Sequence, residues 1–231
     1  MRSKNGRYAA IPGIALAAIV LHTSCAQASF IDLDWSNPDD GRITLDTKTG
    51  LEWLDLSATI GRSYDEVRLE AGPGGEFVGF RHATDVEVRN LWENAGIPII
   101  DDFAYYAANF VPVQGLMNHI GITWDLSYPW DPATTQIAIG LANDTSGLSG
   151  WPTFLRLDKY DDPSLQLASA CFRCGYYSPD GSDPHVGHWM VRTTQVPEPA
   201  TLLLLGIGLA GIGLVRGQSA FLNTPGNRPR F

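Results

Sequence analysis

Apolar and polar residues alternate in two short runs in the first third of the chain. These runs cover residues 43–45 and 51–54, and the segment between them ends in Gly50. Alternation with a period of two is typical of a strand with one buried face, and a glycine-ended connection is typical of a hairpin turn. The pattern therefore predicts a β-hairpin, with Trp53 in the core.

Two capping boxes predict the starts of two helices. In each, a hydroxyl residue is followed three positions later by a glutamate, which is the arrangement that satisfies the free N–H groups of a first helical turn. The boxes begin at Ser63 and Thr84. We expect the first helix to end before the glycines of residues 72–75, and the second to carry Trp92 on its buried face and end at Gly96.

The remaining pattern is less regular. A third helix is expected near residues 102–119, interrupted by Pro112, because proline removes a helical hydrogen bond. Short apolar runs beyond it predict strands at residues 136–141, 153–157, 165–168 and 188–192. Short helices early in the chain and strands later predict an α+β fold, a single compact domain with a mostly antiparallel sheet.

The C-terminal region differs from this pattern. An uncharged stretch, residues 201–215, follows Pro197, Glu198 and Pro199 and is closed by Arg216. A helix of about 15 residues reaches about 22 Å, whereas a membrane crossing takes about 20 apolar residues. A marginal span of this kind is typical of a processed tail. The segment resembles the PEP-CTERM sorting signal of exported bacterial proteins that an exosortase handles.

The N-terminal region is typical of a secretory signal peptide. An apolar run at residues 11–21 follows a basic start, and a small-x-small motif closes it at residues 26–28. We expect cleavage after Ala28. The basic residues of the start are Arg2, Lys4 and Arg7.

The two ends divide the chain into four parts: a signal peptide (1–28), an ectodomain (29–196), a sorting signal with its hydrophobic segment (197–216) and a disordered tail (217–231). The chain has 16 basic and 25 acidic residues. Six of the basic residues and one acidic residue fall in the two ends, which leaves 10 basic and 24 acidic residues in the ectodomain. A surface this acidic repels nucleic acid, so we expect no nucleic-acid partner.

The ectodomain contains two cysteines, Cys171 and Cys174. In the oxidising compartment that an exported chain reaches, we expect them to form a disulfide that pins a turn at residues 172–173. A zinc site with His185 and His188 is the alternative, because the ligand types are right although the spacing departs from the usual values.

Several segments of the ectodomain resemble a recurring ectodomain of PEP-CTERM proteins and, more distantly, the Lcl C-terminal domain family of unknown function. The matching segments are residues 46–56, 61–67, 79–88 and 189–192. This chain departs from that family's pattern at Phe80 and at residues 82–84. The resemblance implies a fold like that of C-type lectins and transfers no catalytic residues.

The sequence contains few motifs that indicate catalysis or metal binding. There is no nucleophile-elbow motif, and the acidic run at residues 32–40 lacks the order of a calcium loop. We expect no catalytic, cofactor or metal residues. Aromatic side chains in a loop-rich region could stack on sugars or could cover the core; they are Trp124, Tyr128, Trp130 and Trp151.

These observations predict an exported surface or extracellular-matrix protein with a structural or adhesive role, associated with extracellular polysaccharide or biofilm. Its expected partners are signal peptidase, an exosortase and extracellular polysaccharide. Its expected route is transient insertion in the inner membrane, then the surface or matrix of a Gram-negative bacterium. The alternatives are a secreted enzyme that acts on matrix polysaccharide and a metal-dependent carbohydrate-binding module.

Overall fold

A computed structural model of the chain describes residues 29–100, 103–127, 133–147 and 150–194. In these residues the strands form two five-stranded sheets. The first sheet has the order β1 (Phe30–Leu33), β2 (Ile43–Asp46), β3 (Leu51–Leu54), β10 (Met190–Thr193) and β4 (Arg81–His82). The second has the order β5 (Trp124–Asp125), β6 (Thr134–Ala142), β7 (Thr153–Asp162) and β8 (Leu165–Tyr176), with β9 (Gly187–His188) paired to β6.

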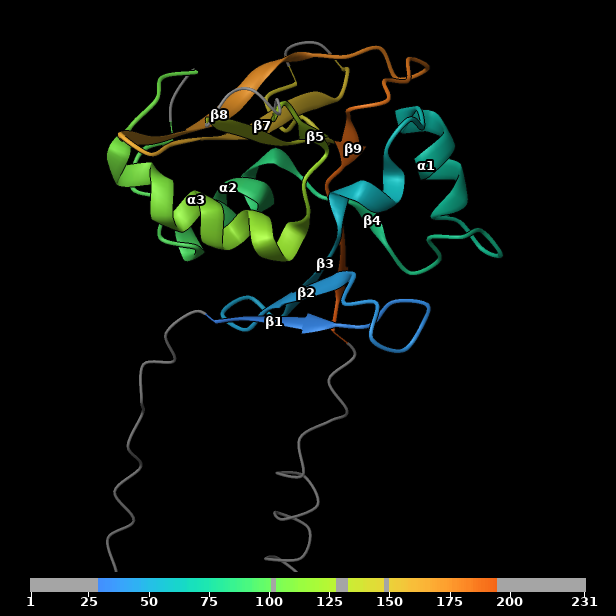
Figure 1. The fold of residues 1–231 in the computed structure, drawn as a ribbon. Coiled ribbons are helices and arrows are strands. Elements are labelled where there is room, and N and C mark those ends of the chain that lie inside the picture. The colour runs from blue at the N-terminus through green and yellow to red at the C-terminus, as the bar shows by residue number, and fades with distance from the viewer. Residues whose placement is uncertain (1–28, 101–102, 128–132, 148–149, 195–231) are drawn as a thin grey trace, which may run out of the picture.

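The strand pairs are antiparallel except for β6 and β9, which are parallel. Two helices, α2 (Asp85–Asn94) and α3 (Ala107–Ile120), lie between the two sheets, while α1 (Tyr64–Glu70) lies to one side (Figure 1). A short 3₁₀ helix, Leu56–Thr59, connects β3 to α1. The predicted α+β class with mostly antiparallel sheets is confirmed.

The locally encoded elements form where the sequence predicts them. The hydroxyl oxygen of Ser63 accepts the Glu66 N–H at 3.2 Å, and the Glu66 carboxylate accepts the Ser63 N–H at 2.7 Å. The same reciprocal pair joins Thr84 and Glu87 at the start of α2. The β2–β3 hairpin turns through Gly50, whose φ of +69° suits a residue without a side chain.

The expected third helix is present, but its start, its interruption at Pro112 and the turn expected at residues 172–173 were predicted wrongly. α3 begins at Ala107, later than expected, and continues through Pro112. Proline there leaves one carbonyl in the preceding turn without its helical N–H partner, and the apolar contacts of α3 with both sheets outweigh that loss. Residues 172–173 do not form a turn, because β8 extends through both cysteines to Tyr176.

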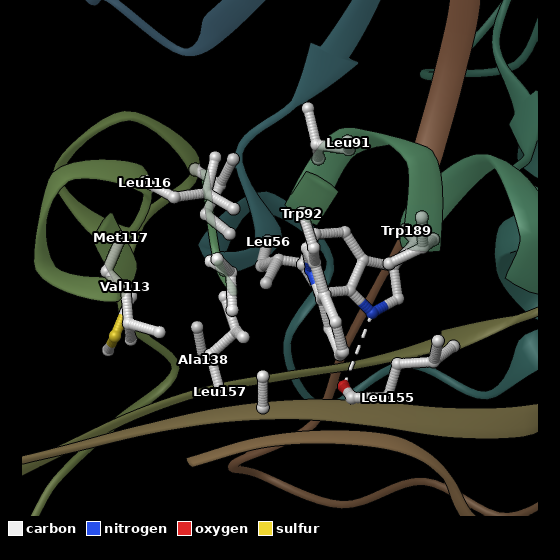
Figure 2. Close-up of a cluster of buried hydrophobic side chains, with 14 of the residues drawn as sticks. Leu56, Leu91, Trp92, Val113, Leu116, Met117, Ala138, Leu155, Leu157 and Trp189 are labelled. Carbon is white, nitrogen blue, oxygen red and sulfur yellow. Dashed lines mark hydrogen bonds between the residues drawn. The ribbon is translucent and has the colours of Figure 1, made fainter. Parts of the chain in front are cut away.

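Three tryptophans pack together in the core, and Figure 2 shows two of them, Trp92 and Trp189. Trp53 and Trp92 each meet Trp189 edge-on, with ring centroids 6.3 and 6.1 Å apart. All three are buried, as predicted for Trp53 and Trp92. The indole N–H of Trp189 donates to the backbone carbonyl of Leu155 at 3.4 Å, which gives this buried polar group a partner in the second sheet.

Trp189 also joins the two sheets through its backbone. Its N–H donates to Leu141 in β6 at 2.9 Å, and its carbonyl accepts the N–H of Ala83 beside β4 at 2.7 Å. The indole requires a glycine beside it, because a Cβ on Gly140 would lie 2.9 Å from the ring. Within the described residues, no helix is long and apolar enough to cross a membrane.

Replacing Trp189 should cost most of the stability of the domain. Trp189→Ala leaves a cavity at the junction of both sheets, so we expect it to lower the free energy of unfolding by about 3–5 kcal/mol. Denaturant unfolding followed by circular dichroism measures this change. Trp124→Ala, at a side chain that is 36% exposed, is the control and should cost much less. Equal unfolding midpoints for the two variants would contradict the central role of Trp189.

Candidate functional site

A cleft of about 440 Å³ lies where α1 meets the connections of the second sheet. It is lined by residues from four separate parts of the chain. These are Tyr64, Asp65 and Arg68 of α1, Asn143 and Asp144 after β6, Gly150, Trp151 and Pro152 before β7, and Pro179 after β8.

The cleft has two aromatic side chains. Trp151 is 50% exposed, so about half of a large aromatic side chain faces solvent. Tyr64 is half-buried, and its ring stacks on the buried ring of His82 with centroids 3.7 Å apart. The stack fixes the Tyr64 ring from behind, and burial raises the pKa of its hydroxyl. Tyr64 therefore enters the cleft as a neutral hydroxyl on a fixed ring.

Polar groups surround these rings. Asp65 and Arg68 are paired at 3.0 Å on the exposed side of α1, and Asn143 is exposed. A carboxylate, an amide and a guanidinium beside an exposed aromatic ring are groups that bind sugars: the ring packs on the C–H faces, and the polar groups bond the hydroxyls. The arrangement can hold a neutral polyhydroxylated ligand.

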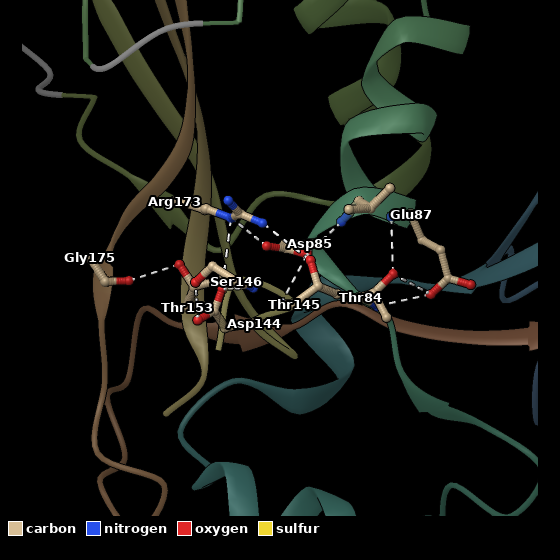
Figure 3. A network of polar contacts seen from close by, with 10 residues as sticks. Thr84, Asp85, Glu87, Asp144, Thr145, Ser146, Thr153, Arg173 and Gly175 are labelled. Atoms are coloured by element: carbon tan, nitrogen blue, oxygen red, sulfur yellow. Dashed lines mark hydrogen bonds and ion pairs between the residues drawn. The ribbon is translucent and has the colours of Figure 1, made fainter. Parts of the chain in front are cut away.

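The segment that carries Asn143 and Asp144 is held by a buried polar network (Figure 3). Asp85, which is fully buried at the start of α2, accepts the hydroxyl of Thr145 at 2.6 Å and the Nε–H of Arg173 at 2.5 Å. Burial alone would raise the pKa of Asp85, but the hydrogen bonds from Thr145 and Arg173 outweigh it and lower that pKa. Asp85 is therefore a charged anchor for the loop.

Behind the cleft lies a buried histidine pair. His82 Nε2 and His188 Nδ1 are 3.0 Å apart, and His188 Nε2 lies 3.0 Å from the Arg62 carbonyl. A carbonyl can only accept, so His188 carries its proton on Nε2, and His82 Nε2–H donates to His188 Nδ1. Burial lowers the pKa of His82 to about 2 and that of His188 to about 4, so both rings are neutral near pH 7.

The predicted cysteine pair forms a disulfide between Cys171 and Cys174 in β8. The four residues of the alternative zinc site do not lie together in the structure. His185 packs on the ring of Trp124 at 4.4 Å, and His188 bonds to His82. Among the described residues, no three His, Cys, Asp or Glu side chains are grouped to hold a metal.

Of the four aromatic residues considered for sugar stacking, Trp151 lines the cleft, and Trp124 packs on His185 elsewhere. Tyr128 and Trp130 lie outside the described residues, as do Ala28 and the sorting-signal residues Pro197, Glu198, Pro199 and Arg216. The sequence did not point to Tyr64, Asp65 or Asn143. The sequence marks Ser63–Glu66 as a helix start, but nothing in it shows that this turn meets the segment before β7.

A second cavity, of about 460 Å³, lies against the first sheet. Glu52 and Arg192 line it and pair with each other at 2.6 Å, and Arg192 lies over the ring of Phe80. Its charged groups pair with each other, and none of the described residues that line it is aromatic. We therefore regard the cleft at Trp151 as the candidate site.

Comparison with known proteins identifies one feature. The PEP-CTERM protein-sorting motif matches residues 195–216. The motif is that of exported proteins sorted by an exosortase, with a membrane-directed C-terminal signal. Neither curated proteins nor solved structures gave a match, so the resemblance to the Lcl family and to lectins gains no support.

The histidine pair should make the protein less stable in acid. An unfolded histidine takes up a proton near pH 6.5, whereas His188 does so near 4 and His82 near 2. The unfolded chain therefore binds more protons below pH 6.5, and the free energy of unfolding falls as the pH falls. In His82→Gln, which keeps a donor for His188, the loss between pH 7 and pH 5 should be smaller by about 1–2 kcal/mol.

Urea unfolding at several pH values measures the difference between the two curves. His185→Gln is the matched control, because its side chain is 43% exposed and lies apart from the pair. Parallel curves for the wild type and His82→Gln would contradict the neutral, buried pair.

Proposed function

We propose that this exported protein is a surface or matrix protein with a structural or adhesive role, and that its cleft binds a short run of sugars in an extracellular polysaccharide. The observation that carries the proposal is the half-exposed Trp151 in a cleft of about 440 Å³ with polar side chains around it. Exposed aromatic surface in a concave site marks a place where ligand replaces water.

The charge of the ectodomain supports a neutral polymer as the ligand. With 10 basic and 24 acidic residues, residues 29–196 repel anionic chains at long range. Within the cleft, the cation Arg68 is paired with Asp65 at 3.0 Å, which reduces its attraction for an acidic sugar. A neutral hexose polymer meets no such repulsion.

The carboxyl groups of the cleft suit ligand binding better than acid–base hydrolysis. A polysaccharide hydrolase needs two carboxyl groups across the reacting bond, one of which delivers a proton. Asp144 is only 2% exposed, accepts two hydrogen bonds from Ser146 and lies beside the Arg173 guanidinium. Asp65 is paired with Arg68. Asp144 is thus buried among partners, and Asp65 lies beside a cation that favours its charged form, so neither carboxyl is arranged to deliver a proton and we favour binding over catalysis.

Trp151→Ala should weaken binding of a soluble neutral polysaccharide by about tenfold, since stacking on an aromatic face contributes about 1 kcal/mol beyond the contact area. Affinity electrophoresis against a panel of β-glucan, mannan and galactan, followed by calorimetry, measures the affinity. Trp124→Ala is the matched control and should bind like the wild type. Absence of binding across the panel, or equal loss in both variants, would contradict the proposal.

The mature protein should lack both ends of the chain. In a host with an exosortase, we expect it to begin at Ser29 and to end close to Pro197–Pro199, because signal peptidase and the exosortase act there. Intact-mass measurement of protein from the cell surface and culture fluid checks both positions. A mature form that retains Phe231 would contradict exosortase processing.

A further inference from the structure

The disulfide lies at an irregularity in β8. Phe154 pairs with Gly175 and Arg156 pairs with Cys171, so one residue of β7 faces three residues of β8, and the strand register shifts. Extra residues of this kind form a bulge, which bends a strand and redirects a side chain. The residues in the bulge are Phe172, Arg173 and Cys174, and the bond from Cys171 to Cys174 closes it.

The bulge sets the direction of Arg173. Its φ is +55°, a left-handed conformation that residues other than glycine adopt at a cost. From there its Nε–H donates to Asp85 at 2.5 Å, its Nη2 donates to Thr145 at 3.2 Å, and Nε lies 3.7 Å from Asp144 (Figure 3). The two carboxylate side chains are 0% and 2% exposed, and Arg173 is the cation beside both of them.

The two carboxylates in turn shape the loop that lines the cleft. The Thr145 N–H donates to Asp85 at 3.4 Å, and the Ser146 N–H donates to Asp144 at 3.0 Å. The backbone of Asn143 is bonded to Ala83 and Asp85. Asn143 is thus held by its own backbone bonds, whereas the loop at Asp144 and Thr145 depends on Arg173, which depends on the closed bulge.

We propose that the Cys171–Cys174 disulfide and Arg173 form a positioning unit for the cleft, so that the cleft binds its ligand only after export has oxidised the two thiols. This inference rests on the proposed function. Before export the cysteines are thiols, because the cytosol is reducing. Without the covalent closure, the strain at Arg173 favours a regular strand, and the buried carboxylates lose their cation.

The oxidation is an ordinary thiol–disulfide exchange with a disulfide-bearing oxidoreductase of the exported compartment. One cysteine thiolate attacks the donor disulfide and forms a mixed disulfide, and the second then attacks that bond. Two protons and two electrons leave the cysteine pair, the bond between Cys171 and Cys174 forms, and the donor leaves as a dithiol.

The fold itself should survive reduction. A disulfide that closes so short a loop removes little freedom from the unfolded chain. The main core cluster is assembled from β3, α2, α3 and the second sheet around Trp189. Reduction should therefore lower the melting temperature by only a few degrees, which separates an effect on the cleft from loss of the fold.

Amide hydrogen exchange of residues 29–194, with and without dithiothreitol, tests the inference directly. We expect the amides of Thr145 and Ser146 to exchange at least about tenfold faster in the reduced protein, since the carboxylates that accept them lose the cation that holds them in place. The ladder amides of β2 and β3, which do not pair with β8, should be unchanged. The double variant Cys171→Ser with Cys174→Ser should reproduce the reduced pattern without reductant.

Arg173→Gln should produce the same faster exchange in an oxidised protein, and Arg173→Lys should restore part of the protection. Arg89→Gln is the matched control. The guanidiniums of Arg89 and Arg173 both lie over the ring of Phe172, at 4.9 and 5.0 Å, but Arg89 pairs with Glu93, away from the loop.

Affinity for the neutral polysaccharide should fall about tenfold on reduction and in Arg173→Gln, and it should be unchanged in Arg89→Gln. Unchanged exchange at Thr145 and Ser146 would overturn the inference, as would equal acceleration of the core strands. If the oxidised wild type binds no polysaccharide, the proposed function fails, and the exchange experiment still decides the role of the disulfide.

Discussion

The attachment of Trp189 to both sheets is the constraint on which the rest of the structure depends. The residue lies between β9, which pairs in the second sheet, and β10, which pairs between β3 and β4 in the first. Its ring fills the space between Trp53 and Trp92, and its backbone bonds to Leu141 and Ala83. One short segment near the end of the ectodomain therefore completes both sheets and closes the core.

The position of the cleft depends on the segment around Trp189 that joins the two sheets. The β6 strand is held by β9 at Gly140 and Leu141, which fixes where the chain leaves the sheet at Asn143. The parallel bridge between Thr84 and Asn143 then ties that exit to the start of α2. On the opposite side, His188 of β9 contacts His82 and so supports the stack under Tyr64. The Asn143 side and the Tyr64 side of the cleft are therefore both held in place through β9.

The elements that the sequence predicted are those encoded locally. Capping boxes at Ser63 and Thr84 and the turn at Gly50 each depend on contacts within a few residues, and large apolar side chains such as Trp53 are buried almost wherever they occur. The disulfide followed from two cysteines in an exported chain. The PEP-CTERM motif was recognised because it is a contiguous pattern.

The features that escaped prediction depend on contacts between distant segments. The continuation of α3 through Pro112 reflects packing against both sheets, which outweighs a local preference. The length of β8 and its bulge depend on pairing with β7. No sequence pattern in β8 predicts the shift in register. Tyr64 and Trp151 belong to one site because the tertiary fold places α1 beside the start of β7.

The two ends of the ectodomain leave it at the same place. The backbone N–H and carbonyl of Ser29 bond to Thr47, and Thr194 bonds to the carbonyl of Gly50, so both ends meet the turn of the β2–β3 hairpin. The second sheet lies on the far side of α2 and α3 from this turn (Figure 1). A membrane segment at either end would therefore place the turn of the β2–β3 hairpin nearest the membrane. The second sheet would then face away from that membrane.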